Sequence, residues 1–288
     1  LADLRADGYK AFYLAIGCQG GRKAGVPGEE AAGIQTAVNL LRTVGGDESH
    51  TMQGKTVVIG GGNVSMDATR TAKRLGAASV ICLYRRRVED MTALPEEISA
   101  AMAEGCEIRP LEAPDHIEKD GDGKVAALWT RPQIIGKYGH DGRPRPGNAA
   151  TDLTRIPCDY VIVAIGQSIV TKPLEQIGVA TDHGAIKAER SSAVPGLNNI
   201  FAGGDAVSGP ATVIRAIAAG KVAAANIDAF LGFDHKISVD IEIPPAHFTN
   251  TPPCGRINLK YHGRPDCSGD FSLPVEGMTA EEARQEAS

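Results

Sequence analysis

The sequence predicts an α/β fold with a mainly parallel sheet, and three observations lead to this prediction. Apolar runs typical of strands alternate with segments at helical spacing, which is the order that parallel sheets require. Glycine is abundant, with 34 of the 288 residues. Phenylalanine, tyrosine and tryptophan together make up only 5% of the chain. Abundant glycine with few aromatic side chains is typical of a chain that makes tight turns between strands and helices.

The composition indicates a globular protein of about two domains. Apolar residues make up 42% and charged residues 23% of the chain, which fits neither a disordered nor a fibrous protein. The formal net charge is -5, so neither a nucleic-acid partner nor an anionic membrane surface is expected. No apolar run approaches the roughly 20 residues that span a bilayer. Six scattered cysteines without a C-x-x-C pair, and no visible signal peptide, favour a cytoplasmic location.

The first expected elements are a strand and a helix. Residues 11–16 (AFYLAI) form a short apolar run that predicts a buried strand, and this strand runs into Gly17 and a glycine-rich loop. Apolar residues at helical spacing predict a helix over residues 34–44, which Gly45 and Gly46 end.

The most distinctive local pattern begins at residue 55. Residues 55–59 (KTVVI) predict a buried strand, and residues 60–65 (GGGNVS) predict a tight turn. An amphipathic helix is expected from there to about Leu75, where Gly76 ends it. Residues 79–84 (SVICLY) predict a second buried strand, which three arginines follow directly.

The expected elements of the remaining chain are short, with one exception. Between residues 95 and 130 we expect, in chain order, a helix over 95–104, strands at 107–109 and 116–118, a hairpin turn at 120–123 and a strand over 124–130. An exposed loop or hairpin over 132–155 and a buried strand over 159–165 are expected next. A strand at 199–202 then precedes the exception, a long alanine-rich helix over 212–231. Residues 233–288 are proline-rich with a short acidic helix near 279–287, which indicates a tail that needs a partner surface.

The turn at residues 60–65 has the spacing of a dinucleotide-binding loop. Gly60 permits the tight turn, Gly62 lets the backbone approach a pyrophosphate, and the small Ser65 lets the helix pack on the strand. The helix N-terminus then presents N–H groups and the positive end of its dipole to the anion. The position between a strand and a helix is the one that such sites require. The alternative is a glycine-rich turn without a ligand.

The end of the next strand indicates which dinucleotide would bind. An acidic residue there would accept a hydrogen bond from the ribose of NAD, but the sequence has Arg85, Arg86 and Arg87. Guanidinium groups can bind a 2′-phosphate with two hydrogen bonds, so the three arginines favour NADP. The alternative is a solvated basic loop in which Glu89 and Asp90 are the partners of the arginines.

Six segments of the sequence, which together cover most of residues 9–232, match one known family in its own order. They are AFYLAIGCQGGRKAGVPGE (11–29), VVIGGGNVSMD (57–67), YRRR (84–87), LPEEI (94–98), VIVAIGQ (161–167) and NIFAGGDAVSGPATVIRAIAAGKVAA (199–224). Together they resemble the flavoprotein reductases with two dinucleotide-binding domains, and most closely the glutamate synthase small-subunit-like oxidoreductases. The NADPH-binding half of dihydropyrimidine dehydrogenase is also similar.

The resemblance implies an NAD(P)-binding Rossmann-like domain inserted in an FAD-binding domain that is truncated here. The implied divisions are the end of the first FAD-domain segment (1–49), the NADP(H)-binding domain (50–165), the second FAD-domain segment (166–232) and a C-terminal tail (233–288). The tail would dock on a partner or lead to a cluster region. The family's N-terminal FAD fingerprint and Cys-rich iron–sulfur region have no counterpart in the sequence. We therefore expect the chain to be the C-terminal part of a longer protein.

The resemblance also assigns residues to two cofactors. The NADP(H) site would comprise Gly60, Gly62, Asn63, Ser65, Arg85 and Arg86. The FAD site would comprise Gly204, Asp205 and Thr212, with Thr212 at a helix N-terminus aimed at the edge of the flavin where reduction builds negative charge. Gly17 and Gly166 would belong to the two crossover strands between the domains. Glu96 and Glu97 match family positions, although carboxylates on a helix surface are the alternative.

The expected function is the transfer of hydride from NADPH to FAD, after which electrons pass to iron–sulfur clusters or a partner subunit. No side chain is expected to act as an acid, a base or a nucleophile, and no residues are expected to bind a metal. The expected partner is the missing N-terminal FAD and iron–sulfur region of the same protein, or a redox subunit. The alternative function is a non-catalytic nucleotide-binding module that docks on a partner.

Overall fold

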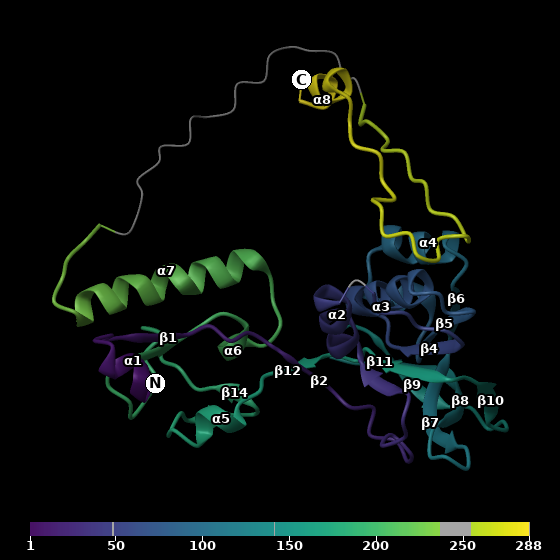
Figure 1. Cartoon of the computed structure of the whole chain (residues 1–288), viewed down its shortest axis with the longest axis horizontal. Coiled ribbons are helices and arrows are strands. Elements are labelled where there is room, and N and C mark those ends of the chain that lie inside the picture. Colours follow the sequence, from purple (N-terminus) through teal and green to yellow (C-terminus); the bar gives the residue numbers. More distant parts are fainter. Residues whose placement is uncertain (48, 141, 237–254, 288) are drawn as a thin grey trace. The chain divides into compact units, whose positions relative to one another are not determined.

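The computed structural model describes residues 1–47, 49–140, 142–236 and 255–287, and it divides into two compact units (Figure 1). Unit 1 comprises Leu1–Gly21 and Gly166–Ile243, and unit 2 comprises Arg22–Ile165 and Pro244–Ser288. The chain therefore leaves unit 1 after Gly21 and returns to it at Gly166. Residues 22–49, which we expect to end the first FAD-domain segment, lie in unit 2.

Unit 2 is built on a sheet of five parallel strands, which confirms the predicted α/β fold class. The strands follow the order β3–β11–β4–β5–β6. Because β5 lies on one side of β4 and β11 on the other, the strand order reverses between β4 and β11, and ligands of such sheets bind beside this point. The strands are β3 (Ile34–Thr36), β4 (Lys55–Ile59), β5 (Ser79–Tyr84), β6 (Glu107–Pro110) and β11 (Tyr160–Val163).

Both faces of this sheet are covered, which explains why its central strands are nearly continuous apolar runs. Val58 and Ile162 lie in the core on one face, and Val57 and Val161 lie in the core on the other. The helices of the first face are α2 (Ala37–Gly46), α3 (Asn63–Arg74) and α4 (Pro95–Ala103). The second face is covered by antiparallel strands β7 (Glu112–Lys119), β8 (Val125–Tyr138) and β10 (Thr154–Pro157).

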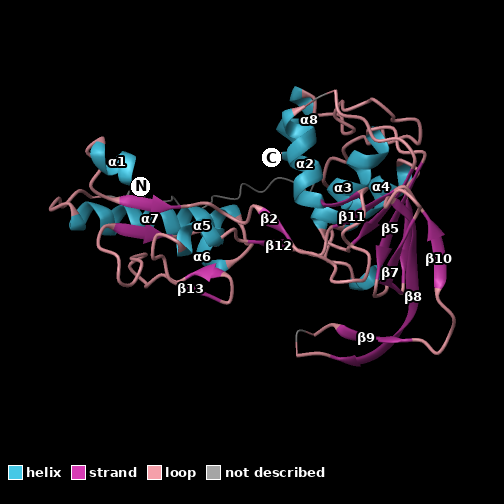
Figure 2. Cartoon of the chain, turned by 60° about the horizontal axis from the view of Figure 1, so that its bottom comes forward, coloured by secondary structure: helices cyan, strands magenta, loops and turns pink. Residues whose placement is uncertain are grey.

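Two expected elements of unit 2 have other bounds in the structure, namely the helix over residues 34–44 and the strand over residues 124–130. Residues 34–36 form strand β3 beside β11 instead of starting a helix, and the helix begins only at Ala37, where the Thr36 hydroxyl accepts a hydrogen bond from the Asn39 N–H. Pairing with a distant strand therefore overrides the local helical spacing. Strand β8 runs on to Tyr138 and pairs with β9 (Pro144–Asn148), so the region expected as a loop or hairpin is a long hairpin (Figure 2).

Unit 1 contains short strands and one long helix. Strands β1 (Phe12–Leu14) and β15 (Ile200–Ala202) pair in parallel, and their side chains form half of the buried core of the unit. The predicted long helix is α7 (Val213–Phe230). The other elements are α1 (Ala2–Ala6), β2 (Gly20–Gly21), β12 (Gln167–Ser168), α5 (Lys172–Glu175), β13 (Thr181–Asp182), β14 (Ala185–Ile186) and α6 (Asp205–Ser208).

Residues 261–272 of the tail pack on α3 and α4 of unit 2. The Gly269 N–H donates to the carbonyl of Arg74 at 2.7 Å, and Arg74 Nη1 donates to the carbonyl of Asp270 at 2.8 Å. The Tyr261 hydroxyl donates to Glu104 at 3.1 Å, and Cys267 is buried. Residues 261–272 thus find a surface on the same chain, whereas helix α8 (Ala280–Glu286) has no buried residue. The proline-rich residues 237–254 of the predicted tail lie outside the described residues.

Among the parts of the chain that the structure describes, no helix combines the length and the apolar character that a membrane span requires.

Candidate functional site

The turn after β4 lies where the strand order of the sheet reverses. Gly60 has a φ of 153°, a region that residues with a side chain rarely adopt. A Cβ at this position would also collide with the Ser65 hydroxyl and with the backbone carbonyl of Ala164. Ala164 follows β11, so Gly60 stands at the ends of the two strands that flank the reversal point. Only glycine fits here, on grounds of both conformation and space.

Ser65 holds the start of α3 against the sheet. Its side chain is fully buried, and its hydroxyl donates to the carbonyl of Ala164 at 3.2 Å. The same oxygen accepts the Gly62 N–H at 3.3 Å. Glycine at this position would make neither hydrogen bond, so the serine connects the turn to the end of β11 in a way that glycine could not.

Gly62 and Asn63 form the first turn of α3. The nearest atom to a Cβ built on Gly62 is the Thr92 hydroxyl at 3.4 Å, so the protein itself leaves room for a side chain there. A pyrophosphate that approached this backbone would need that room. The Asn63 side-chain oxygen accepts the Leu94 N–H at 2.9 Å, which holds the following loop beside the turn. The first N–H groups of a helix have no acceptor within it, and they are the groups that bind anions.

Gly61 also requires glycine, and the sequence pattern did not single it out. A Cβ on Gly61 would collide with the ring of Tyr84, the last residue of β5. The Gly61 carbonyl accepts the Thr92 N–H at 2.9 Å and the Ala93 N–H at 3.1 Å. The ring of Tyr84 is therefore one wall of the glycine-rich turn. The only signal in the sequence is that three glycines stand in a row.

The three arginines after β5 have three different environments. Arg85 is exposed, and within the described residues its side chain has no hydrogen-bond or ion-pair partner. Arg86 is buried and its Nε donates to the carbonyl of Pro144 at 2.8 Å. Arg87 forms an ion pair with Asp90 at 2.9 Å, and this hydrogen bond lowers the pKa of the Asp90 carboxyl. Arg87 therefore fits the alternative of a basic loop whose arginines pair with neighbouring carboxylates. Arg85 is available to bind an anion.

The residues predicted to bind FAD lie together in unit 1. Gly204 has a φ of 65° and begins α6, and the Asp205 carboxylate accepts the Ala211 N–H at 3.2 Å. The Thr212 hydroxyl caps the N-terminus of α7 and accepts the Arg215 N–H at 3.4 Å. A Cβ on Gly203, which the sequence pattern did not single out, would displace the Tyr13 hydroxyl.

The other predicted residues are placed as follows. Gly17 and Gly166 lie in unit 1 and both adopt a positive φ, of 62° and 133°. Glu97 lies on α4 and pairs with Arg70 at 2.6 Å, and Glu96 is exposed on the same helix. The two glutamates thus have the contacts of helix-surface carboxylates. In the part of the chain that the structure describes, no three histidine, cysteine or carboxylate side chains gather as metal ligands would.

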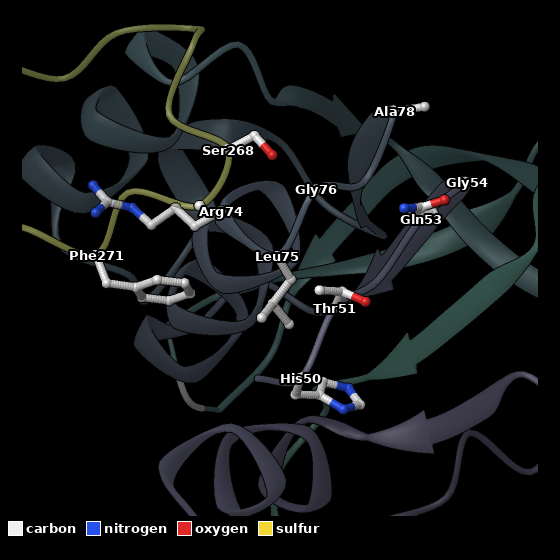
Figure 3. Close-up of a pocket in the computed structure, with 11 residues that line it drawn as sticks. His50, Thr51, Gln53, Gly54, Arg74, Leu75, Gly76, Ala78, Ser268 and Phe271 are labelled. Atoms are coloured by element: carbon white, nitrogen blue, oxygen red, sulfur yellow. The ribbon is translucent and has the colours of Figure 1, made fainter. Parts of the chain in front are cut away.

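A pocket of about 510 Å³, which none of these residues lines, lies between the end of α3, residues 50–54 and residues 268–271 of the tail (Figure 3). Leu75 and Phe271 provide its apolar lining. The guanidinium of Arg74 beside it is already bound to Glu104 and to the carbonyls of Asp270 and Ser272. The pocket therefore offers no unengaged charge to a ligand.

Comparison with known proteins places the chain in a family. The model of the pyridine nucleotide-disulphide oxidoreductase family matches residues 2–220. The beta subunit of the NADP(+)-dependent formate dehydrogenase of Moorella thermoacetica is 34% identical over 226 residues, which are 77% of this chain and 32% of that protein. The glutamate synthase (NADPH) small chain of Escherichia coli strain K12 is 33% identical over 243 residues, 79% of this chain and 51% of that protein.

The fold has a solved counterpart in FprA from Mycobacterium tuberculosis in complex with NADPH. The superposition of the two structures has a TM-score of 0.63 at 18% sequence identity, and the match covers 81% of this chain and 66% of FprA. At this identity the likeness shows the fold alone. The chain spans between 32% and 51% of the length of the two curated relatives named above.

Proposed function

The chain belongs to the pyridine nucleotide-disulphide oxidoreductase family, and we propose that it transfers hydride from NADPH to FAD within an electron-transferring flavoprotein. The observation that supports this most strongly is the turn at residues 60–65. It lies at the point of strand reversal, its Gly62 leaves room for a ligand, and the unengaged Arg85 follows the next strand. When bound, the nicotinamide and the flavin supply the redox chemistry, and the protein binds and orients them.

In this proposal unit 2 binds NADP(H). The N–H groups at the start of α3 bind the pyrophosphate, with Gly62 allowing its approach. Gly60, Asn63 and Ser65 hold the shape of the turn through the contacts described above. Arg85 binds the 2′-phosphate, and the buried Arg86 supports the loop from which Arg85 projects. The implied NADP(H) domain covers residues 50–165.

Unit 1 contributes to the FAD site in this proposal. Gly204 and Asp205 bind the pyrophosphate and ribityl chain, and Thr212 places the positive end of the α7 dipole towards the flavin. In this proposal Gly17 and Gly166 belong to the two crossover segments, where each precedes a short strand, β2 or β12. The FAD-domain segments that the resemblance implies are residues 1–49 and 166–232, of which residues 22–49 lie in unit 2, and the implied tail is 233–288.

We also propose a partner for unit 1 and a cytoplasmic location. On helix α7 the exposed fractions of Val213, Ile214 and Ile217 are 75%, 79% and 55%. Apolar side chains exposed side by side in this way are typical of a surface that another protein surface covers. Its partner is the remaining FAD-binding and iron–sulfur region of a longer protein, or a separate redox subunit. The relatives include proteins named as subunits of a formate dehydrogenase and of glutamate synthase, which supports a partner in electron transfer.

Calorimetric titration of the purified chain with NADPH and NADH tests the proposal, with bound flavin measured from its visible spectrum. We expect tight binding of NADPH and weak binding of NADH. The absence of binding by either nucleotide to a folded chain would contradict the proposal. Binding of NADPH without reduction of bound flavin would instead support a non-catalytic nucleotide-binding module.

Replacing Arg85 with alanine tests the choice of nucleotide. We expect the affinity for NADPH to fall by about tenfold or more, since a charge-assisted contact with the 2′-phosphate is lost, while the affinity for NADH stays nearly unchanged. Arg155→Ala is the matched control, because Arg155 is paired with Glu118 on the antiparallel sheet. Equal losses for NADPH and NADH in Arg85→Ala would remove the argument from the 2′-phosphate.

A further inference from the structure

We propose that Arg143, on the loop between β8 and β9, is a positioning residue that makes the site prefer a 2′-phosphorylated nucleotide. The residue acts on Arg85 through Tyr84 and the loop at residues 85–90. This inference rests on the proposed function, and it adds a determinant that lies about sixty residues away from the dinucleotide motif, on an element without any motif of its own.

Arg143 binds both ends of the arginine loop. Its Nη2 donates to the Tyr84 hydroxyl at 2.5 Å and to the backbone carbonyl of Asp90 at 2.7 Å. The Tyr84 hydroxyl in turn donates to the same carbonyl of Asp90 at 2.8 Å. The three groups close the loop between the end of β5 and Asp90. Since Arg85 lies within this loop, its position depends on that closure.

The neighbouring residue of the hairpin adds a second tie. The buried Pro144 accepts the Arg86 Nε–H at 2.8 Å, so the hairpin also holds the residue next to Arg85. With Arg86 bound to the hairpin and Arg87 bound to Asp90, Arg85 is the arginine of the three that is left to face a ligand. The hairpin therefore determines which arginine is available.

Tyr84 connects this closure with the phosphate-binding turn. Its side chain is 7% exposed, and its ring occupies the space where a Cβ on Gly61 would stand. This packing holds the ring in place, so a change at the Tyr84 hydroxyl acts on the arginine loop rather than on the turn. Arg143 also adds a positive charge at the end of β5, where the 2′-phosphate would lie. This charge would attract the dianionic phosphate of NADP but not the neutral ribose hydroxyl of NAD.

The experiment compares adenosine 2′,5′-bisphosphate with 5′-AMP as calorimetric probes of the purified chain. In the wild type we expect the bisphosphate to bind about tenfold more tightly or better. Arg143→Ala is expected to reduce this preference by about fivefold, since hydrogen bonds that position the loop are lost, with little change in the affinity for 5′-AMP. Arg145→Ala is the matched control, because Arg145 is exposed on the same hairpin and is expected to keep the preference.

A second variant separates positioning from charge. Tyr84→Phe keeps the ring against Gly61 and changes no charge, but it removes the hydroxyl that accepts from Arg143. We expect Tyr84→Phe to reduce the preference for the bisphosphate as well. The double variant with Arg143→Ala should lose less of this preference than the two single losses added together, because both substitutions remove the same contact. If Arg143→Ala kept the wild-type preference while Arg85→Ala lost it, the inference would be wrong. If the wild type itself showed no preference, the proposed NADP function would fail.

Discussion

Replacing Glu104 with alanine is expected to lower the free energy of unfolding of unit 2 by about 3–5 kcal/mol, the usual cost of removing one member of a buried ion pair. The Glu104 side chain is completely buried at the end of α4. It is bound by Arg70 at 2.9 Å, by Arg74 at 2.7 Å and by the Tyr261 hydroxyl at 3.1 Å. Without it, two largely buried guanidinium groups would face each other, and the tail would lose a contact.

Denaturant-induced unfolding measures this effect. The fluorescence of Trp129, the single tryptophan of the chain, reports on unit 2 because Trp129 lies on β8. Glu107→Ala is the matched control, since Glu107 pairs with Arg109 at the surface, where ion pairs contribute about 0–1 kcal/mol. Equal losses for Glu104→Ala and Glu107→Ala would show that the buried cluster is not a stability determinant.

The same cluster predicts the direction of a pH dependence. Burial raises the pKa of the Glu104 carboxyl, but the hydrogen bonds from Arg74 and Arg70 outweigh it and hold the pKa below its ordinary value. A lowered pKa in the folded state stabilises the protein above the unfolded pKa of about 4.3, and that stabilisation is lost as the pH falls through the folded pKa. Glu104→Gln should therefore show a shallower loss of stability below about pH 4.3 than the wild type. Parallel acid profiles would contradict this assignment.

Gly62→Ala is expected to weaken the binding of NADPH and NADH by about tenfold or more, equivalent to about 1.4 kcal/mol, without unfolding the chain. Its φ of -105° suits alanine, and the nearest atom to the new methyl is the Thr92 hydroxyl at 3.4 Å. The methyl would stand where the pyrophosphate approaches the backbone, so the loss falls on both nucleotides alike.

Gly60→Ala provides the contrast, because its added methyl would collide with Ser65 and Ala164 at a φ of 153°. We expect this variant to lower the thermal unfolding midpoint as well as nucleotide binding. Calorimetry and thermal unfolding of both variants separate a ligand site from a purely structural turn. Unchanged nucleotide affinity in Gly62→Ala would mean that residues 60–65 form a glycine-rich turn without a ligand.

Local sequence patterns predicted the elements around this turn well. The strand at residues 55–59, the helix that follows the turn and the strand at 79–84 have the expected bounds within a residue or so. The strand at 34–36 was missed because its partner β11 lies more than a hundred residues further along the chain. The spacing of neighbouring residues does not indicate a partner at that distance. The full extent of β8 was missed for a different reason, because glycine, proline and arginine residues interrupt the hairpin that its end forms with β9.

For this protein the sequence alone was sufficient to determine the α/β class, the dinucleotide pattern and the family, because each depends on residue types at short spacings. Only the tertiary structure decided which arginine is available, since Arg86 and Arg87 are occupied by Pro144 and Asp90. It also decided that Gly61 must be glycine, that Arg143 closes the arginine loop, and that Glu104 joins the tail to α3. These contacts link residues far apart in the chain, and their energies depend on burial and distance, which exist only after folding.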